Sequence, residues 1–244
     1  MKTKTGMKII IKGFIKSSLL DWDGKIVSTI YVPYCNMRCP YCQNAGLLLN
    51  PDEYPTISID EIKSFFLEHK DFMDGICLTG GEPCLYGDLL DFLKEFKDIG
   101  AKIKLDTNGT FPEKIKKVIE KNLVDYIAMD IKAPLDFEHY KKSSGLKSRE
   151  LFDRVKESIR IIMESDIDYE FRTTVVPTLH KEKDIEEIAK FIKGAKKYAL
   201  QNFQNQDTLD ENFKNIEPYK RKTLEKFAKS LSGYIQKAVV RGRD

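Results

Sequence analysis

The chain has 244 residues, of which 41% are hydrophobic and 32% are charged, a composition typical of a folded globular protein. Its formal net charge of +3 is too small to indicate a nucleic-acid partner, because the lysines are interspersed with acids. No apolar run reaches the length of a membrane span, and lysines interrupt the short apolar run near the N-terminus, so we predict neither a signal peptide nor a membrane segment and expect a cytoplasmic protein.

After a leader of turns and short extended pieces at residues 1–24, apolar runs typical of strands alternate with amphipathic segments typical of helices. The first predicted helix opens on Ser58 and Glu61, which have the spacing of a capping box. The predicted strands are residues 25–33, 75–79, 101–105, 125–131, 168–176 and 197–203. The predicted helices are residues 58–70, 88–99, 112–121, 149–165, 183–193 and 217–235.

This alternation indicates an α/β fold in which right-handed crossovers join parallel strands. The six strands predict a partial (β/α)6 TIM-type barrel that stays open on one side. No repeat or low-complexity linker interrupts the series, so residues 1–244 are predicted to form a single domain. Its barrel core would span about residues 25–204, and residues 205–244 would form a C-terminal helical extension.

Three of the five cysteines, Cys35, Cys39 and Cys42, lie within eight residues with the spacing C-x3-C-x2-C. A loop with this spacing can direct three thiolates at one iron–sulfur cluster, which normally takes four, and so leaves one iron open for reaction. A zinc site, a disulfide framework and three unrelated buried cysteines are the alternatives. No fourth ligand with zinc spacing lies nearby, and disulfide frameworks suit short secreted chains.

Each conspicuous polar motif follows one of the first four predicted strands. These motifs are residues 35–42, 80–83, 106–109 and 130–132. Because the carboxyl ends of the strands of a barrel meet at one face, where barrel chemistry is found, we expect all four motifs to lie together.

The aromatic Tyr41 before Cys42, and the run Gly80-Gly81-Glu82-Pro83 after the next strand, complete a pattern that resembles the radical SAM superfamily. The resemblance implies one [4Fe–4S] cluster held by Cys35, Cys39 and Cys42. It also implies that S-adenosylmethionine chelates the fourth iron and is reductively cleaved to methionine and a 5′-deoxyadenosyl radical. Such a cluster is sensitive to oxygen, so an anaerobic setting is expected.

The resemblance also implies which residues contact the cofactor. Glu82 would pair with the methionine ammonium group. Asp130 and Lys132 match an Asp-x-Lys pair that contacts the cofactor, and Asp106 and Asp130 match carboxylates near a monovalent cation. Arg172 would either reach the cofactor carboxylate or form a structural salt bridge. On the residues alone, the same stretches also fit a plain turn, a helix N-cap and a strand-end ion pair. The implied contacts are Tyr41, Gln43, Gly80, Gly81, Glu82, Asp106, Asn108, Asp130, Lys132 and Arg172.

The remaining cysteines and the histidines fit no second metal site. Cys77, in the middle of a predicted strand, is expected in the core, and Cys84 is expected near the site. Two spare cysteines are too few for a second conventional cluster. The three histidines, His69, His139 and His180, lack metal-ligand spacing and are expected at the surface or at helix caps.

Within the superfamily, residues 13–44, 129–134 and 173–177 are similar to the activating proteins of anaerobic ribonucleoside-triphosphate reductase, and the similarity extends over residues 13–204. Gln43 departs from the histidine frequent there. This branch implies hydrogen abstraction from a glycine Cα of a partner glycyl-radical enzyme, with a flavodoxin- or ferredoxin-type electron donor. The alternatives are a radical SAM enzyme acting on a small molecule, similar to 7-carboxy-7-deazaguanine synthase, and a non-catalytic iron–sulfur or zinc binding module.

Overall fold

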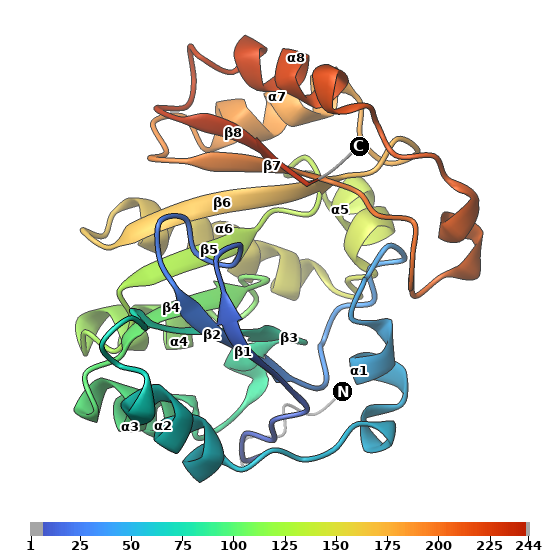
Figure 1. Cartoon of the computed structure of the whole chain (residues 1–244). Helices are drawn as coiled ribbons and strands as arrows, with labels where there is room; N and C mark the ends of the chain where they lie inside the picture. The colour runs from blue at the N-terminus through green and yellow to red at the C-terminus, as the bar shows by residue number, and fades with distance from the viewer. Residues whose placement is uncertain (1–6, 243–244) are drawn as a thin grey trace.

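The computed structural model describes residues 7–242 and shows one open sheet in which strands follow one another in chain order (Figure 1). Strands β2 to β8 run parallel, and β1 pairs antiparallel with β2. The predicted α/β class, with an open and mostly parallel sheet, is therefore confirmed. The strands are β1 Gly13–Ser18, β2 Val27–Val32, β3 Gly75–Gly80, β4 Lys102–Thr107, β5 Tyr126–Asp130, β6 Asp168–Val175, β7 Tyr198–Asn202 and β8 Ala238–Arg241.

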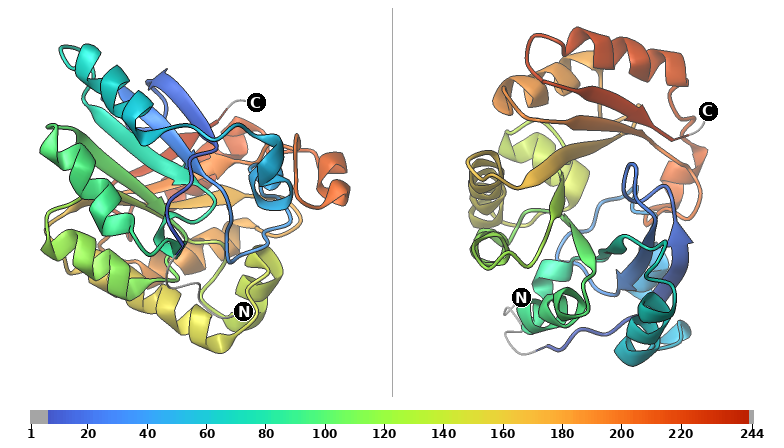
Figure 2. Two further views of the ribbon diagram at one scale, coloured as in Figure 1. Left: turned by 90° about the horizontal axis from the view of Figure 1, so that it is seen from below. Right: turned by 60° about the vertical axis from the view of Figure 1, so that its left-hand side comes forward.

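The crossover helices cover the outer face of the curved sheet (Figure 2). Their sequences explain this position: in α3 the buried residues Leu89, Phe92, Leu93 and Phe96 recur at the spacing of one helix face. No helix within residues 7–242 is long and apolar enough to cross a membrane. The α-helices are α1 Ala45–Leu49, α2 Ile59–Glu68, α3 Leu89–Asp98, α4 Pro112–Glu120, α5 Phe137–Ser144, α6 Arg149–Met163, α7 Glu182–Phe191 and α8 Arg221–Ser230, and the short 3-10 helices are η1 Pro51–Glu53, η2 Pro83–Leu85 and η3 Glu211–Asn215.

The two faces of the sheet differ in chemistry because side chains alternate along each strand. On β4, Ile103 and Leu105 belong to the main hydrophobic core. The intervening Lys104 and Asp106 are also buried, on the opposite face. The inner face of the sheet therefore carries buried charged groups that the outer, helix-covered face lacks on this strand, and it is this inner face that the candidate site uses.

Both ends of the sheet differ from the prediction. Strand β1 forms inside the predicted leader, and β8 lies in residues 205–244, which were expected to be helical. The helix expected at 217–235 is reduced to α8, which begins after Pro218, and proline is disfavoured inside a helix. Strand β8 has only four residues, which is too short to show a clear alternation of apolar and polar residues. The short helices α1 and α5 were likewise not predicted.

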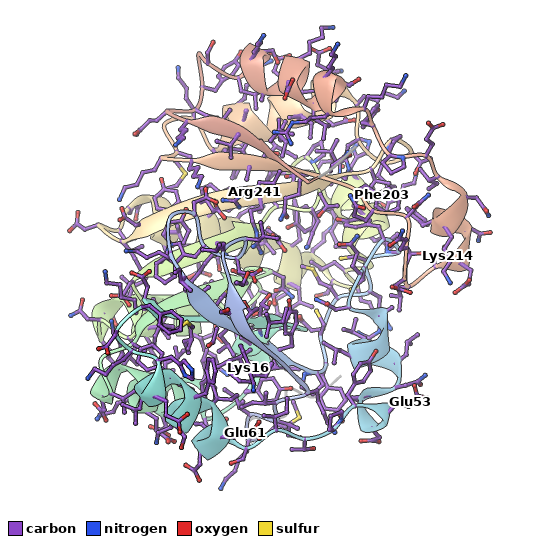
Figure 3. All side chains as sticks on the ribbon, in the orientation of Figure 1. Lys16, Glu53, Glu61, Phe203, Lys214 and Arg241 are labelled. Carbon is purple, nitrogen blue, oxygen red and sulfur yellow. The ribbon has the colours of Figure 1, made fainter. Side chains whose placement is uncertain are left out.

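Ion pairs connect the two edges of the open sheet. Asp23, in the turn between β1 and β2, accepts from Arg241 of β8 at 2.9 Å and also pairs with Lys197 before β7. Arg241, labelled in Figure 3, also donates to both carboxylate oxygens of Glu170 on β6, at 2.6 and 2.8 Å. We call Asp23, Glu170, Lys197 and Arg241 the lower ion-pair network. It links the first hairpin to the last strand without any β1–β8 pairing.

Candidate active site

The carboxyl ends of the parallel strands surround a cavity of about 320 Å³. The cluster loop, which we define as residues 34–44, forms one wall, and the ends of β3, β4, β5 and β6 form the others. All of the residues predicted to bind a metal or cofactor line this cavity, as the topology of a parallel barrel leads one to expect. They are Cys35, Cys39, Cys42, Tyr41, Gln43, Gly80, Gly81, Glu82, Asp106, Asn108, Asp130, Lys132 and Arg172.

The three cysteines of the cluster loop are free thiols. The Met37 and Asn108 nitrogens approach the Cys35 sulfur at 3.4 and 3.6 Å, and the Cys39 sulfur lies 3.7 Å from the Ser144 carbonyl oxygen. Burial raises the pKa of Cys35 to about 12 and that of Cys39 to about 11. Without a metal these thiols are therefore protonated at neutral pH, and ligation of iron would release their protons.

Glu82 is fully buried, and its carboxylate is held by groups of the chain itself. The backbone N–H groups of Cys84 and Asn108 donate to it at 2.9 and 2.7 Å, and the Thr107 hydroxyl donates at 2.8 Å. Burial nevertheless raises its pKa. The Glu82 side chain thus connects the turn after β3 to the end of β4, a role that the expected contact with a cofactor ammonium group did not include.

Gly81 is required by the neighbouring main chain. A Cβ atom at this position would lie 1.8 Å from the Tyr34 carbonyl oxygen, which is closer than any real contact. The Gly81 N–H donates to Val32 at 2.7 Å, and the Glu82 N–H donates to Tyr34 at 2.8 Å. The absence of a side chain therefore lets the Gly-Gly-Glu-Pro turn pack directly on the start of the cluster loop, whereas the sequence argument attributed these glycines to contact with the ligand.

Arg172 joins the carboxylates at the ends of two strands. It donates to Asp106 at 2.9 Å and to Asp130 at 2.8 Å, while Lys104 pairs with Asp106 and Lys132 with Asp130. Burial by itself would raise the pKa of both carboxyl groups, but the adjacent cations outweigh it and hold each pKa below its usual range. We call these five residues the upper ion-pair network. Of the two roles expected for Arg172, the structure shows the structural salt bridge.

This network gives the predicted monovalent cation no support. Two carboxylates, Asp106 and Asp130, already face three cations of the chain, Lys104, Lys132 and Arg172. Both carboxylates thus already have cationic partners in the chain, and the cation site stays a prediction.

Tyr41 of the cluster loop contacts His180 edge to face, with ring centroids 6.5 Å apart. The Tyr41 hydroxyl is buried and has no hydrogen-bond partner among the described residues. His180, expected at the surface or a cap, is instead fully buried, and its ring lies 2.8 Å from the Lys132 carbonyl oxygen and 3.0 Å from the Val176 nitrogen. Gln43 is exposed and donates to the Gln204 carbonyl at 3.3 Å.

The sequence analysis missed several polar residues of the cavity. Each of Tyr31, Thr79 and Thr174 occupies an inward position at the end of a strand, so strand alternation could have identified them. Asp21 and Gln201 had no motif to mark them. The predicted core position of Cys77 is correct, since it is fully buried. Cys84 is also fully buried, and the Thr107 hydroxyl lies 3.6 Å from its sulfur.

The donor set fits an iron–sulfur cluster better than a single metal ion. Within residues 7–242, no three His, Cys, Asp or Glu side chains are placed to hold one ion, yet Cys35, Cys39 and Cys42 all face one cavity as free thiols. A cluster needs this wider arrangement, because each thiolate binds a different iron. The buried, unpartnered Tyr41 hydroxyl and the charged walls also leave polar groups for a polar ligand beside the cysteines.

Comparison with known proteins agrees with this chemistry. The sequence profile of the radical SAM superfamily matches residues 29–193. The chain is 35% identical over 240 residues to a putative glycyl-radical enzyme activating enzyme of Methanocaldococcus jannaschii, covering 96% of this chain and 97% of the relative. It is 28% identical to a pyruvate formate-lyase-activating enzyme of Clostridium pasteurianum, covering 87% of this chain and 94% of that enzyme. A 7-carboxy-7-deazaguanine synthase of Thermoplasma acidophilum is 29% identical but covers only 56% of this chain.

Solved structures show the same fold. Streptococcus suis SuiB bound to its precursor peptide SuiA matches with a TM-score of 0.67 at 15% identity, over 88% of this chain and 48% of SuiB. A radical SAM methyltransferase from Sphaerobacter thermophilus matches with a TM-score of 0.66 at 16% identity, over 88% of this chain and 66% of that protein. The chain therefore belongs to the radical SAM superfamily, is homologous to glycyl-radical enzyme activating enzymes, and takes a [4Fe–4S] cluster and S-adenosylmethionine as cofactors.

Proposed function

We propose that this chain activates a glycyl-radical enzyme by removing a hydrogen atom from a glycine Cα of that partner, and that the partner is an anaerobic ribonucleotide reductase. The observation that carries the proposal is the end-to-end similarity to activating enzymes. The match to the deazaguanine synthase is confined to little more than half of the chain. The reductase itself rests on the sequence resemblance alone.

In this proposal Cys35, Cys39 and Cys42 hold the cluster, and the remaining residues predicted for the cavity hold S-adenosylmethionine. When bound, the two cofactors supply the reductive cleavage that generates a hydrogen-abstracting radical. The upper ion-pair network fixes the carboxylates and cations of the cavity before the ligand arrives, so little reorganisation is required on binding. The Glu82 carboxylate holds the turn after β3 to the end of β4, and the Glu82 N–H holds the same turn to Tyr34 of the cluster loop.

The open sheet supports a protein substrate, because a partial barrel leaves a side through which a loop can reach the cavity. A small-molecule substrate has one observation in its favour. Polar side chains that the cofactor assignment does not use, Asp21, Tyr31, Thr174 and Gln201, also line the cavity. These side chains could hydrogen-bond a small polar ring in the same way as they could a peptide backbone.

The test is anaerobic. The cluster is reconstituted, reduced with dithionite, and 5′-deoxyadenosine is measured for the wild type, for Cys39→Ala and for Cys77→Ala as a control at a buried cysteine outside the cavity. We expect release by the wild type and by Cys77→Ala only. A glycyl-radical signal by electron paramagnetic resonance, on addition of the candidate reductase, would identify the substrate. Deoxyadenosine release that survives Cys39→Ala, or no radical on the reductase, would contradict the respective part of the proposal.

A further inference from the structure

The cluster loop comes close to the protein surface on the side away from the cavity. The Arg38 N–H and the Cys39 sulfur both lie against the Ser144 carbonyl oxygen at the end of α5, at 2.8 and 3.7 Å. Figure 1 shows α5 beside this loop. Gly145, the next residue, is partly exposed and has a φ of +66°. Thus the main chain of α5 ends directly against a predicted cluster ligand, and solvent lies just beyond it.

Glycine at position 145 makes this contact possible. A Cβ atom there would lie 2.6 Å from the Arg38 carbonyl oxygen, and its positive φ is strained for any other residue. The chain therefore turns tightly against the cluster loop and continues to Lys147. Lys141 and Lys142 lie in the last turn of α5, immediately before this turn.

Four exposed cations belong to the main-chain segments that meet here: Arg38, Lys141, Lys142 and Lys147, which we call the cluster-side basic patch. None of the four forms an ion pair with another described residue, and the Arg38 guanidinium donates only to the carbonyl oxygens of Cys35 and Met37. On α3, by contrast, Lys94 is neutralised by Asp98 four residues later.

Helix stability explains only part of this patch. Lys141 and Lys142 complement the negative end of the α5 dipole, but Arg38 and Lys147 lie outside the helix and gain nothing from it. The acids of α5, Asp136 and Glu138, are at its other end, about 12 Å away for a helix of eight residues.

The acids that border the cluster loop on its other side already have partners. The Asp210 N–H donates to the Pro40 carbonyl oxygen, and the Asp210 carboxylate caps η3. Glu211 is paired with Lys214 at 2.8 Å. Asp184 and Glu187 line a cavity together with Lys142, but Asp184 accepts from the Lys181 N–H and Glu187 pairs with Lys183. The four cations of the patch therefore have no ion-pair partner among the described residues.

We propose that the cluster-side basic patch is the docking surface for an acidic one-electron carrier protein of the flavodoxin or ferredoxin type. The inference rests on the radical chemistry of the proposed function, which consumes an electron from outside. At this surface the reduced carrier loses one electron and the cluster gains it. The position suits transfer, because the patch adjoins the Cys39 side of the loop and leaves the cavity and the open side of the sheet free for cofactor and substrate. Opposite charge would steer the carrier to this face.

The experiment compares two double charge reversals of equal size. Lys141→Glu with Lys142→Glu changes the patch. Lys121→Glu with Lys193→Glu changes two exposed lysines that follow α4 and α7, at the opposite end of the strands. The probe is an acidic flavodoxin. Its binding is measured by titration calorimetry in the oxidised state, and the rate at which its reduced form bleaches the cluster absorbance is measured by stopped flow.

We expect the patch variant to lower the second-order reduction rate about tenfold at low salt, and this difference to shrink as salt is raised. Flavodoxin binding should weaken in parallel, whereas the Lys121/Lys193 variant should resemble the wild type in both measurements. Equal effects of the two variants, no effect of the patch variant, or no binding of flavodoxin to the wild type at low salt would overturn the proposal. Dithionite bypasses docking, so deoxyadenosine release with dithionite should be the same in all three proteins. Its absence from the wild type would count against the proposed function instead.

Discussion

The two ion-pair networks inside the sheet use the same chemistry for different purposes. The upper network joins Asp106 and Asp130 through Arg172, and four of its five residues line the cavity. The lower network joins Asp23 and Glu170 through Arg241, and none of its residues lines the cavity. Glu170 and Arg172 are two residues apart on one face of β6. The two networks therefore lie next to each other along the strands, on the inner face of the sheet.

A buried ion pair therefore does not by itself mark a functional site. Burial by itself would raise the pKa of Glu170, as it would those of the upper carboxyl groups, but Arg241 and other cations hold it below its usual range. Perturbed pKa values therefore do not separate the two networks. What separates them is position: the upper network lies at the carboxyl ends of the strands beside the cysteines, and the lower one connects the edges of the sheet.

Removing the central cation of the upper network should have the largest effect. Arg172→Met removes one charge-assisted hydrogen bond from each of two buried carboxylates, which keep only Lys104 and Lys132 as partners. Two such losses should lower the free energy of unfolding by about 3–5 kcal/mol. Urea unfolding of the metal-free protein measures this. S-adenosylmethionine binding to the reconstituted protein, measured by calorimetry, should also be lost.

Arg172→Lys is the matched control for this prediction. A lysine keeps the charge but cannot donate to both carboxylates from a planar fork, so an intermediate effect is expected. If Arg172→Met were as stable as the wild type, the upper network would contribute little to folding, and this prediction would be wrong.

The corresponding change in the lower network should affect stability alone. Arg241→Met removes the two guanidinium donors from the fully buried Glu170 but leaves Lys197 3.2 Å away and the Tyr126 hydroxyl beside it, so a loss of about 2 kcal/mol is expected. Binding of S-adenosylmethionine should be unchanged. The control is Arg160→Met, at an exposed arginine on α6. If Arg241→Met weakened cofactor binding as well, the two networks would act as one unit and the distinction between them would fail.

The upper network could be predicted from the sequence in large part, and the lower one could not. Asp106, Asp130 and Lys132 belong to short motifs directly after strands, and the topology of a parallel sheet brings such motifs to one face. Asp23 and Arg241 are far apart in the chain, and they meet only because β8 forms. That strand depends on pairing with β7, which outweighs the weak local preference of four residues.

The same limit explains the other residues that sequence reasoning misplaced or missed. His180 has no metal-ligand spacing and was placed at the surface or a cap, but its ring meets Lys132 and Val176 because the ends of β5 and β6 are neighbours. The roles of Glu82 and Gly81 were attributed to the cofactor because a motif shows where a turn is and not what packs behind it. The pattern of a single sequence therefore does not predict which distant segments come into contact.

The smallest effect is expected at the exposed end of the lower network. The Asp23 side chain is 54% exposed, so solvent screens its pairs with Lys197 and Arg241, and Asp23→Asn should lower the free energy of unfolding at neutral pH by less than about 1 kcal/mol. Burial would raise the pKa of Asp23, but Lys197 and Arg241 outweigh it and lower that pKa below 3.8. The difference in free energy of unfolding between the wild type and Asp23→Asn is therefore fully present above pH 3.8. It is lost as the pH falls through the folded-state pKa, when the carboxylate takes up a proton.

Urea unfolding of the wild type and of Asp23→Asn at a series of pH values tests this sign, because the two curves should converge at the acid end. Added salt at neutral pH should reduce the same difference, since both pairs are screened. A difference that is independent of pH and salt would mean that Asp23 acts through the shape of the β1–β2 turn and not through its charge. The ion pairs of Glu170 with Arg241 and Lys197 would then connect only β6, β7 and β8, and the charge of Asp23 would not hold the first hairpin to the last strand.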